Sequence, residues 1–172
     1  MVKKSWLIIG AIGCLIGLGG IGAFTGFQLR GSQGRSVAQE IEVTPTIAAE
    51  VYRTPTCGCC GAWIDHATAN GFTFVDQIQP DITAIKEQFG ITPELASCHT
   101  TVVAGYVFEG HIPAADIRRF LAQPPAGVVG LTVPGMPIGS PGMEVGDRQQ
   151  AYEVLAIHGD GSTSIFQEYP GD

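Results

Sequence analysis

The sequence predicts a mixed α/β domain that follows an apolar N-terminal segment. Strand and helix patterns alternate between Glu50 and Ala122, and glycine follows two of the expected helices. Two further strand patterns lie near the C-terminus. Alternation of this kind is typical of α/β domains. The 134 residues after Ala38 are enough for one domain with its own core.

The N-terminal segment predicts export. Lys3 and Lys4 precede 24 uncharged, mostly apolar residues, 6–29. This stretch is long enough to span a bilayer as a helix, and longer than the roughly 7–15 apolar residues of a signal peptide. Ser36-Val37-Ala38 offers a cleavage site before Gln39. We therefore expect residues 1–38 to be a membrane anchor or signal peptide, and residues 39–172 to be periplasmic or anchored facing the periplasm.

Each expected element has a local signal. Alternation predicts the strands, Asn70-Gly71 and Gly90 end the first two helices, and Pro124-Pro125 follows the third. After a linker at 39–48, the expected elements are a strand at 50–54, a helix at 59–70, a strand at 72–78, a helix at 80–89, strands at 100–104 and 106–109, and a helix at 113–122.

This β-α-β-α-β-β-α order, with a cysteine motif between the first strand and the first helix, predicts a thioredoxin-like domain. An added C-terminal part follows. Residues 124–147 are rich in glycine and proline, and we expect a loop without regular structure there. Residues 151–157 and 164–169 then predict a β-hairpin around His158-Gly-Asp-Gly161.

The charge of the domain excludes one class of partner. Residues 39–172 hold all sixteen acidic residues but only five of the nine basic ones, a formal charge of −11. Such a domain repels phosphate backbones, so we expect no nucleic-acid partner. The charge favours solubility and attracts cations.

Three of the five cysteines lie within four residues, as Cys57, Cys59 and Cys60. Pairing within Cys59-Cys60 or across Cys57-Gly-Cys59 closes a strained ring, so the motif predicts a reactive cluster and not a scaffold of disulfides. At the start of a helix, amide groups and the helix dipole stabilise thiolates, which bind metals. Cysteine, histidine and methionine together form the ligand set that Cu(I) prefers, and thiolates can bridge two or more Cu(I) ions.

Cys98-His99 precedes the third strand. In thioredoxin-like folds this turn lies opposite the cysteines of the first helix and usually carries a cis-proline. We expect a thiol and an imidazole to replace that proline here. We expect both Cys98 and His99 to be ligands or, for the thiol, a redox partner.

Methionine and histidine complete the expected site. Met136 and Met143 lie seven residues apart in one Gly/Pro loop, and thioethers suit Cu(I) but not Zn²⁺. For His111, at a strand-to-helix corner, two roles stay open: facing the same pocket or capping the third helix. His66 is expected to pack or form a hydrogen bond, and His158 to lie on the surface.

With these residues in view, the chain resembles the CopG-type family of exported copper-resistance metalloproteins. The resemblance spans about 50–169 and rests on four segments, which are 57–66, 97–100, 109–113 and 130–144. It implies a thioredoxin-like fold whose Cys-x-Cys-Cys motif holds a multinuclear, cysteine-bridged copper cluster, with redox cycling of copper as the role.

We therefore expect a copper-binding protein of the cell envelope that provides copper tolerance by sequestration or redox conversion, with copper oxidoreductase activity left open. The expected partners are copper ions and a redox partner or copper-efflux components. Two alternatives remain: a thiol–disulfide oxidoreductase using Cys57 and Cys60, and a structural zinc site. The expected metal ligands are Cys57, Cys59, Cys60, Cys98, His99, His111, Met136 and Met143.

Overall fold

The computed structural model describes residues 45–172, so the expected anchor and cleavage site lie outside the described residues. Within this range, no helix has both the length and the apolar character needed to cross a membrane. The helices are α1 (Gly58–Ala69), α2 (Thr83–Gln88) and α3 (Ala114–Ala122). The strands are β1 (Ile47–Arg53), β2 (Phe72–Ile78), β3 (His99–Val103), β4 (Tyr106–Glu109), β5 (Val128–Thr132), β6 (Tyr152–His158) and β7 (Thr163–Tyr169).

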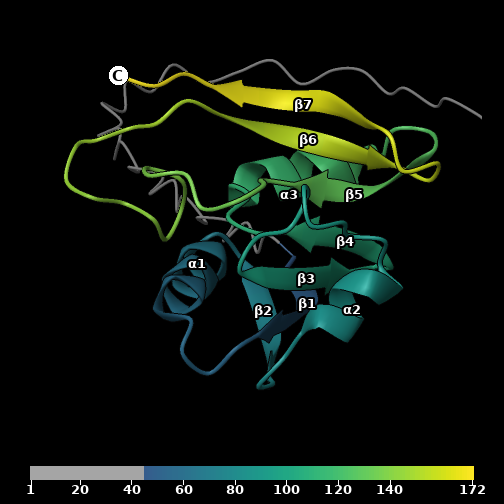
Figure 1. The fold of residues 1–172 in the computed structure, drawn as a ribbon, viewed down its shortest axis with the longest axis horizontal. Helices are drawn as coiled ribbons and strands as arrows, with labels where there is room; N and C mark the ends of the chain where they lie inside the picture. The colour runs from purple at the N-terminus through teal and green to yellow at the C-terminus, as the bar shows by residue number, and fades with distance from the viewer. Residues whose placement is uncertain (1–44) are drawn as a thin grey trace, which may run out of the picture. The chain divides into compact units, whose positions relative to one another are not determined.

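The strands form one seven-stranded mixed sheet in the order β2-β1-β3-β4-β5-β6-β7 (Figure 1). The pairs β1–β2 and β4–β5 are parallel, and the other pairs are antiparallel. The expected β-α-β-α-β-β-α order is confirmed, as is the C-terminal hairpin, which β6 and β7 form.

One strand contradicts the expectation from sequence. Residues 124–147 contain β5, which joins the hairpin to β4. Gly130, which suggested a loop, is required in this strand, because a Cβ there would collide with the carbonyl oxygen of Val107 on β4. Glycine in a strand often marks such a close backbone approach.

Two boundaries differ from the expected ones by three residues. Strand β1 begins at Ile47, inside the expected linker, because Ile47 and Ala48 pair with Phe72 and Thr73 of β2. Helix α2 begins at Thr83 and not at Pro80, because the carboxylate of Asp81 accepts bonds from Thr83 N at 2.8 Å and Thr83 Oγ1 at 2.6 Å. This local bond holds the chain in a turn before the helix starts.

The sheet separates two apolar clusters. The larger joins α1 and α3 to one face through side chains that include Trp63, Phe108 and Phe120. The smaller centres on Val107, next to Phe108 in β4, and on Ile91 just after α2. Because successive residues of a strand point to opposite faces, β4 contributes to both clusters.

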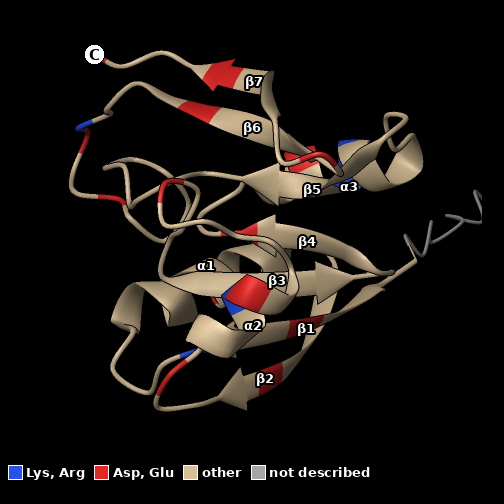
Figure 2. Ribbon diagram, turned by 45° about the vertical axis from the view of Figure 1, so that its right-hand side comes forward, with Lys and Arg blue, Asp and Glu red and all other residues tan. Residues whose placement is uncertain are grey.

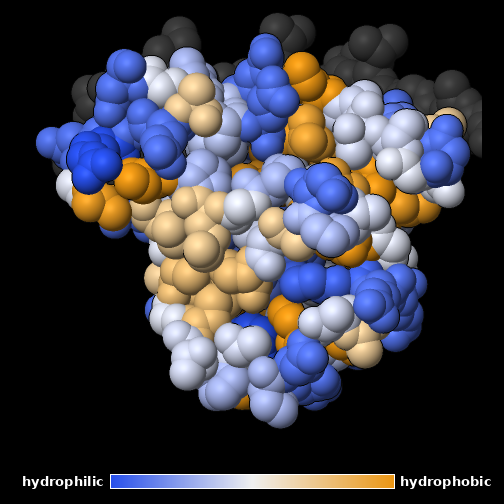
Figure 3. All heavy atoms as spheres, in the orientation of Figure 1, coloured by the Kyte–Doolittle hydropathy of each residue, from blue (hydrophilic) through white to orange (hydrophobic). Residues whose placement is uncertain are grey.

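Charge and hydropathy are unevenly distributed over the described surface. Figure 2 shows acidic positions on most strands and on the C-terminal loops, with few basic positions among them. Figure 3 shows a moderately hydrophobic surface over α1, the helix that carries the cysteine motif.

Candidate metal centre

The start of α1 places the first three thiols. Cys57 lies just before the helix, and Cys59 and Cys60 lie in its first turn. A disulfide joins Cys57 to Cys60, whereas Cys59 and Cys98 are free. The disulfide therefore uses the Cys-x-x-Cys spacing and avoids the two strained pairings. Cys60 is buried, and Cys59 and Cys98 are half-buried.

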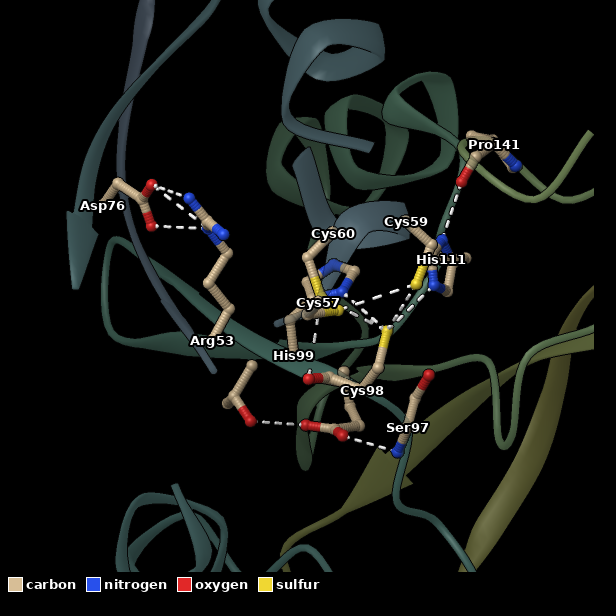
Figure 4. The surroundings of a disulfide bond; sticks show 12 residues. Arg53, Cys57, Cys59, Cys60, Asp76, Ser97, Cys98, His99, His111 and Pro141 are labelled. Atoms are coloured by element: carbon tan, nitrogen blue, oxygen red, sulfur yellow. Dashed lines mark hydrogen bonds and ion pairs between the residues drawn. A yellow bond between two sulfur atoms is a disulfide. The ribbon is translucent and has the colours of Figure 1, made fainter. Parts of the chain in front are cut away.

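Cys98 brings a fourth sulfur to this group (Figure 4). Its Sγ lies 3.5 Å from Cys60 Sγ and 3.7 Å from Cys59 Sγ, and Cys59 Sγ lies 3.6 Å from Cys57 Sγ. The sequence expectation that the turn before the third strand faces the helix cysteines is thus correct for Cys98. The four sulfurs are close enough to bind one metal ion or to share several.

The same thiol also contacts two imidazoles. Cys98 Sγ lies 3.4 Å from His99 Nδ1 and 2.9 Å from His111 Nε2. Both histidines are fully buried, and their ring centroids are 5.1 Å apart. Cys98, His99 and His111 form a second possible metal-binding group that shares Cys98 with the first.

A backbone carbonyl orients His111. Its Nδ1 lies 2.8 Å from the carbonyl oxygen of Pro141, which can only accept a hydrogen bond. Nδ1 therefore carries the proton, and Nε2 presents its lone pair to Cys98. Histidines that bind metals commonly donate their other ring N–H to a carbonyl in this way. His99 Nε2 is buried without a hydrogen-bond partner among the described residues, and the ring packs on Trp63 with centroids 4.5 Å apart.

Burial sets the protonation of these groups. It raises the pKa of Cys98 to about 12, with a further contribution from Cys59. Burial also lowers the pKa of His111, and it lowers that of His99 well below its usual value, aided by the positive charge of neighbouring groups. The metal-free site at neutral pH therefore holds neutral imidazoles, which are the ligand form, and a protonated Cys98 thiol.

The Gly/Pro loop closes one side of the site. Gly142 has φ +82°, and a Cβ there would lie 2.7 Å from Trp63 N and 2.8 Å from Cys59 O. The loop backbone thus packs directly on the first turns of α1. Met136 is 51% exposed, and Met143 is half-buried. Their role as ligands stays a prediction.

The remaining histidines are accounted for. His66 Nε2 accepts a hydrogen bond from Ala114 N, at the start of α3, over 3.2 Å. The bonding role expected for His66 is confirmed, and it caps the helix that His111 was considered to cap. His158 Nε2 lies 2.9 Å from Ser164 Oγ in the hairpin, and its side chain is half-buried.

Two supporting groups were missed from the sequence. The backbone carbonyl of Pro141 orients His111. A pattern of side chains in the sequence does not predict which backbone carbonyl will lie beside a histidine. Glu109, fully buried at the end of β4, accepts bonds from the turn that carries Cys98. The available signal for Glu109 in the sequence was an acidic residue that directly follows the apolar run Tyr106-Val-Phe108.

Comparisons with known proteins found one family and two solved structures that are similar to this chain. Residues 95–143 match a family described as "Protein of unknown function, DUF411". Two solved structures, titled copper resistance protein CopG forms 1 and 2, are 48% and 47% identical to the chain. Both have a TM-score of 0.69 and cover 73% of this chain and 99% of theirs. The chain belongs to the CopG family. No curated protein matches it. The matched segment, 95–143, contains Cys98, His99, His111, Met136 and Met143, whereas the α1 cysteines precede this segment.

Proposed function

We propose that this protein binds copper in the cell envelope through a cysteine-bridged cluster and provides copper tolerance by sequestration or redox conversion. The observation that carries the proposal is the position of Cys98 Sγ, within 3.7 Å of two other sulfurs and within 3.4 Å of two imidazole nitrogens. The titles of the two related CopG structures support the link to copper resistance.

The donor set fits copper. Thiolates and thioethers prefer Cu(I), and imidazole suits both valences. With the disulfide reduced, Cys57, Cys59, Cys60 and Cys98 supply up to four thiolates, and His99 Nδ1 and His111 Nε2 lie beside the Cys98 sulfur. Thiolates stabilise Cu(I) and imidazoles make Cu(II) more acceptable, so a mixed shell supports electron transfer and a copper oxidoreductase role.

The remaining parts of the proposal rest on the sequence. Met136 and Met143 would add thioethers, and the apolar segment 6–29 would export the domain or anchor it facing the periplasm. A redox partner or copper-efflux components would then exchange electrons or ions with it. The sheet order β2-β1-β3-β4 and the cysteines at the start of α1 support a thioredoxin-like ancestry of the core.

Copper titration tests the proposal. The purified, reduced protein should bind more than one Cu(I) tightly in competition with a Cu(I) chelator, with thiolate-to-copper absorption in the near ultraviolet. With the Cys57–Cys60 disulfide intact, the stoichiometry should fall, because two of the four sulfurs are then not available as thiolates. Binding of one ion or none by the reduced protein would rule out the cluster.

The disulfide favours a second candidate, thiol–disulfide exchange. Cys98 Sγ lies 3.5 Å from Cys60 Sγ, within reach for attack on the Cys57–Cys60 bond. The pKa of about 12 for Cys98 counts against it, because the thiolate is the nucleophile and is scarce at neutral pH. Metal-free reduction of insulin that is lost in Cys57→Ser and unaffected by Met136→Leu would favour the exchange enzyme.

A further inference from the structure

A buried carboxylate lies beneath the turn that carries Cys98. Glu109 ends β4, and its side chain is fully buried. Its Oε1 accepts a hydrogen bond from Ser97 N over 2.6 Å and pairs with the ammonium group of Lys86 on α2. Its Oε2 accepts a bond from Thr100 Oγ1 over 2.6 Å. Both oxygens of the carboxylate therefore have hydrogen-bond or ion-pair partners.

These bonds fix the chain on both sides of two expected ligands. Ser97 immediately precedes Cys98, and Thr100 immediately follows His99. A backbone bond from Gly110 N to His99 O, 2.9 Å long, adds a third attachment. Because one carboxylate holds both flanks, the position of the Cys98–His99 pair depends on where Glu109 lies.

The net stability of the ion pair alone is a poor explanation for this arrangement. A buried ion pair often contributes no more stability than apolar side chains of similar volume, because both charges lose their hydration. An apolar side chain at Glu109 would, however, leave Ser97 N and the Thr100 hydroxyl without their acceptor. The carboxylate therefore provides geometry that an apolar core would not.

Cys98 is the ligand for which this geometry matters most. Its sulfur contacts Cys59 and Cys60 on one side and His99 and His111 on the other, at 2.9–3.7 Å. A displacement of the Cys98 turn would separate the sulfur group from the imidazole group, even if each stayed intact. Loss of such outer hydrogen bonds typically weakens metal binding roughly 10- to 100-fold.

We propose that Glu109, held by Lys86, is a positioning residue that fixes Cys98 as the thiol common to both donor groups. Glu109 acts through Ser97 and Thr100 and is not itself a ligand. This inference rests on the proposed copper-binding function and adds to it the residue that sets the geometry.

The test compares Glu109→Gln with a control of matched burial in the full-length protein. Asp116→Asn alters a buried acid, 4% exposed, that pairs with Arg119 at 2.9 Å and accepts a bond from Tyr169 on β7. Lys86→Met removes the cation that holds Glu109, and Lys86→Arg retains it. Circular dichroism and thermal unfolding first establish that each metal-free variant folds.

Cu(I) competition titration of the reduced variants gives the first readout. Glu109→Gln and Lys86→Met should weaken Cu(I) binding roughly 10-fold or more and alter the near-ultraviolet thiolate-to-copper bands. Lys86→Arg should restore both toward wild type. Asp116→Asn should lower the melting temperature and leave affinity and spectrum unchanged. Should Glu109→Gln not fold, the comparison of Lys86→Met with Lys86→Arg decides the question.

A second readout needs no metal. In a Cys14→Ser, Cys59→Ser background with the disulfide intact, Cys98 is the one remaining thiol. Its rate of reaction with a chromogenic disulfide should change several-fold in Glu109→Gln or Lys86→Met but not in Asp116→Asn. If the wild-type protein binds no Cu(I), the proposed function is wrong. The reaction rates of the Cys98 thiol still test the role of Glu109 in that case. Equal thiol rates in the Glu109, Lys86 and Asp116 variants would overturn the inference.

Discussion

At the scale of single residues, Cys98 belongs to both donor groups, whereas Cys59 belongs only to the sulfur group. Cys98→Ser should therefore weaken Cu(I) binding by at least about tenfold more than Cys59→Ser, a difference of about 1.4 kcal/mol. Chelator competition on the reduced variants measures it. Equal losses would mean that the imidazole group does not share a metal with the sulfurs.

The buried histidines predict how the metal-free protein responds to acid. The pKa of an imidazole is near 6.5 in the unfolded chain, and burial lowers the pKa of His99 and His111 in the fold. Below about pH 6.5 the unfolded chain binds protons that the folded protein does not. The free energy of unfolding should thus fall as the pH drops below 6.5, by up to about 1.4 kcal/mol per pH unit for each histidine.

Urea unfolding of the metal-free protein at pH 7.5 and 5.5 measures this effect. His99→Phe should reduce the difference between the two values, because one titrating group is gone. A difference as large in His99→Phe as in wild type would show that other groups cause the acid sensitivity.

At the scale of elements, the loop before β6 holds the start of α1 through Gly142. Gly142→Ala would place a Cβ at 2.7–2.8 Å from backbone atoms of α1 and would also strain φ +82°. Gly146→Ala carries a similar conformational cost at φ +57° with no atom within 4 Å of the new Cβ. We expect losses of about 3 kcal/mol or more for Gly142→Ala and about 1–2 kcal/mol for Gly146→Ala.

Denaturant unfolding measures both losses. Because Pro141 orients His111, Gly142→Ala should also weaken Cu(I) binding, whereas Gly146→Ala should not. Equal effects of the two substitutions on stability and on binding would mean that the contact between the loop and α1 is unimportant.

The helices and strands also show which parts of the fold and of the site can be predicted from sequence patterns. The order of the first seven elements, the hairpin and the meeting of Cys98 with the α1 cysteines follow from alternation, glycine caps and motif placement. Strand β5 was missed because Gly130 resembles a breaker until its contact with Val107 on β4 is known. Pro141 acts through its backbone carbonyl, on which side-chain patterns give no information. The role of Glu109 depends on Ser97 and Thr100, which only the fold places beside its carboxylate.

At the scale of the whole molecule, the donors come from α1, β3 and its preceding turn, and the corner between β4 and α3. An ion bound to all of them should stabilise the fold. At a free Cu(I) concentration about 1,000 times Kd, the gain is about 4 kcal/mol, or roughly 10–20 °C in Tm. Thermal unfolding with and without Cu(I) measures it, with Cys98→Ser as the control.

Removal of metal should leave the protein folded, because the large cluster around Trp63, Phe108 and Phe120 holds the sheet to α1 and α3. Circular dichroism after chelation checks this expectation. A structural zinc site predicts the opposite, since such domains unfold without their ion. Unfolding on chelation would therefore favour zinc over copper.

The His66 bond described above and a second bond, from Trp63, link α1 to the segment that carries His111. Trp63 Nε1 donates to Ile112 O over 2.9 Å, and His66 accepts from Ala114 N over 3.2 Å. Helix α1 and the segment that carries His111 are thus held together in the metal-free protein. Binding of an ion should therefore cost little conformational entropy in these two segments. Once the Cys57–Cys60 disulfide is reduced, we therefore expect copper to bind without a closing movement of these two segments and to enter past the half-buried Cys59 and Cys98.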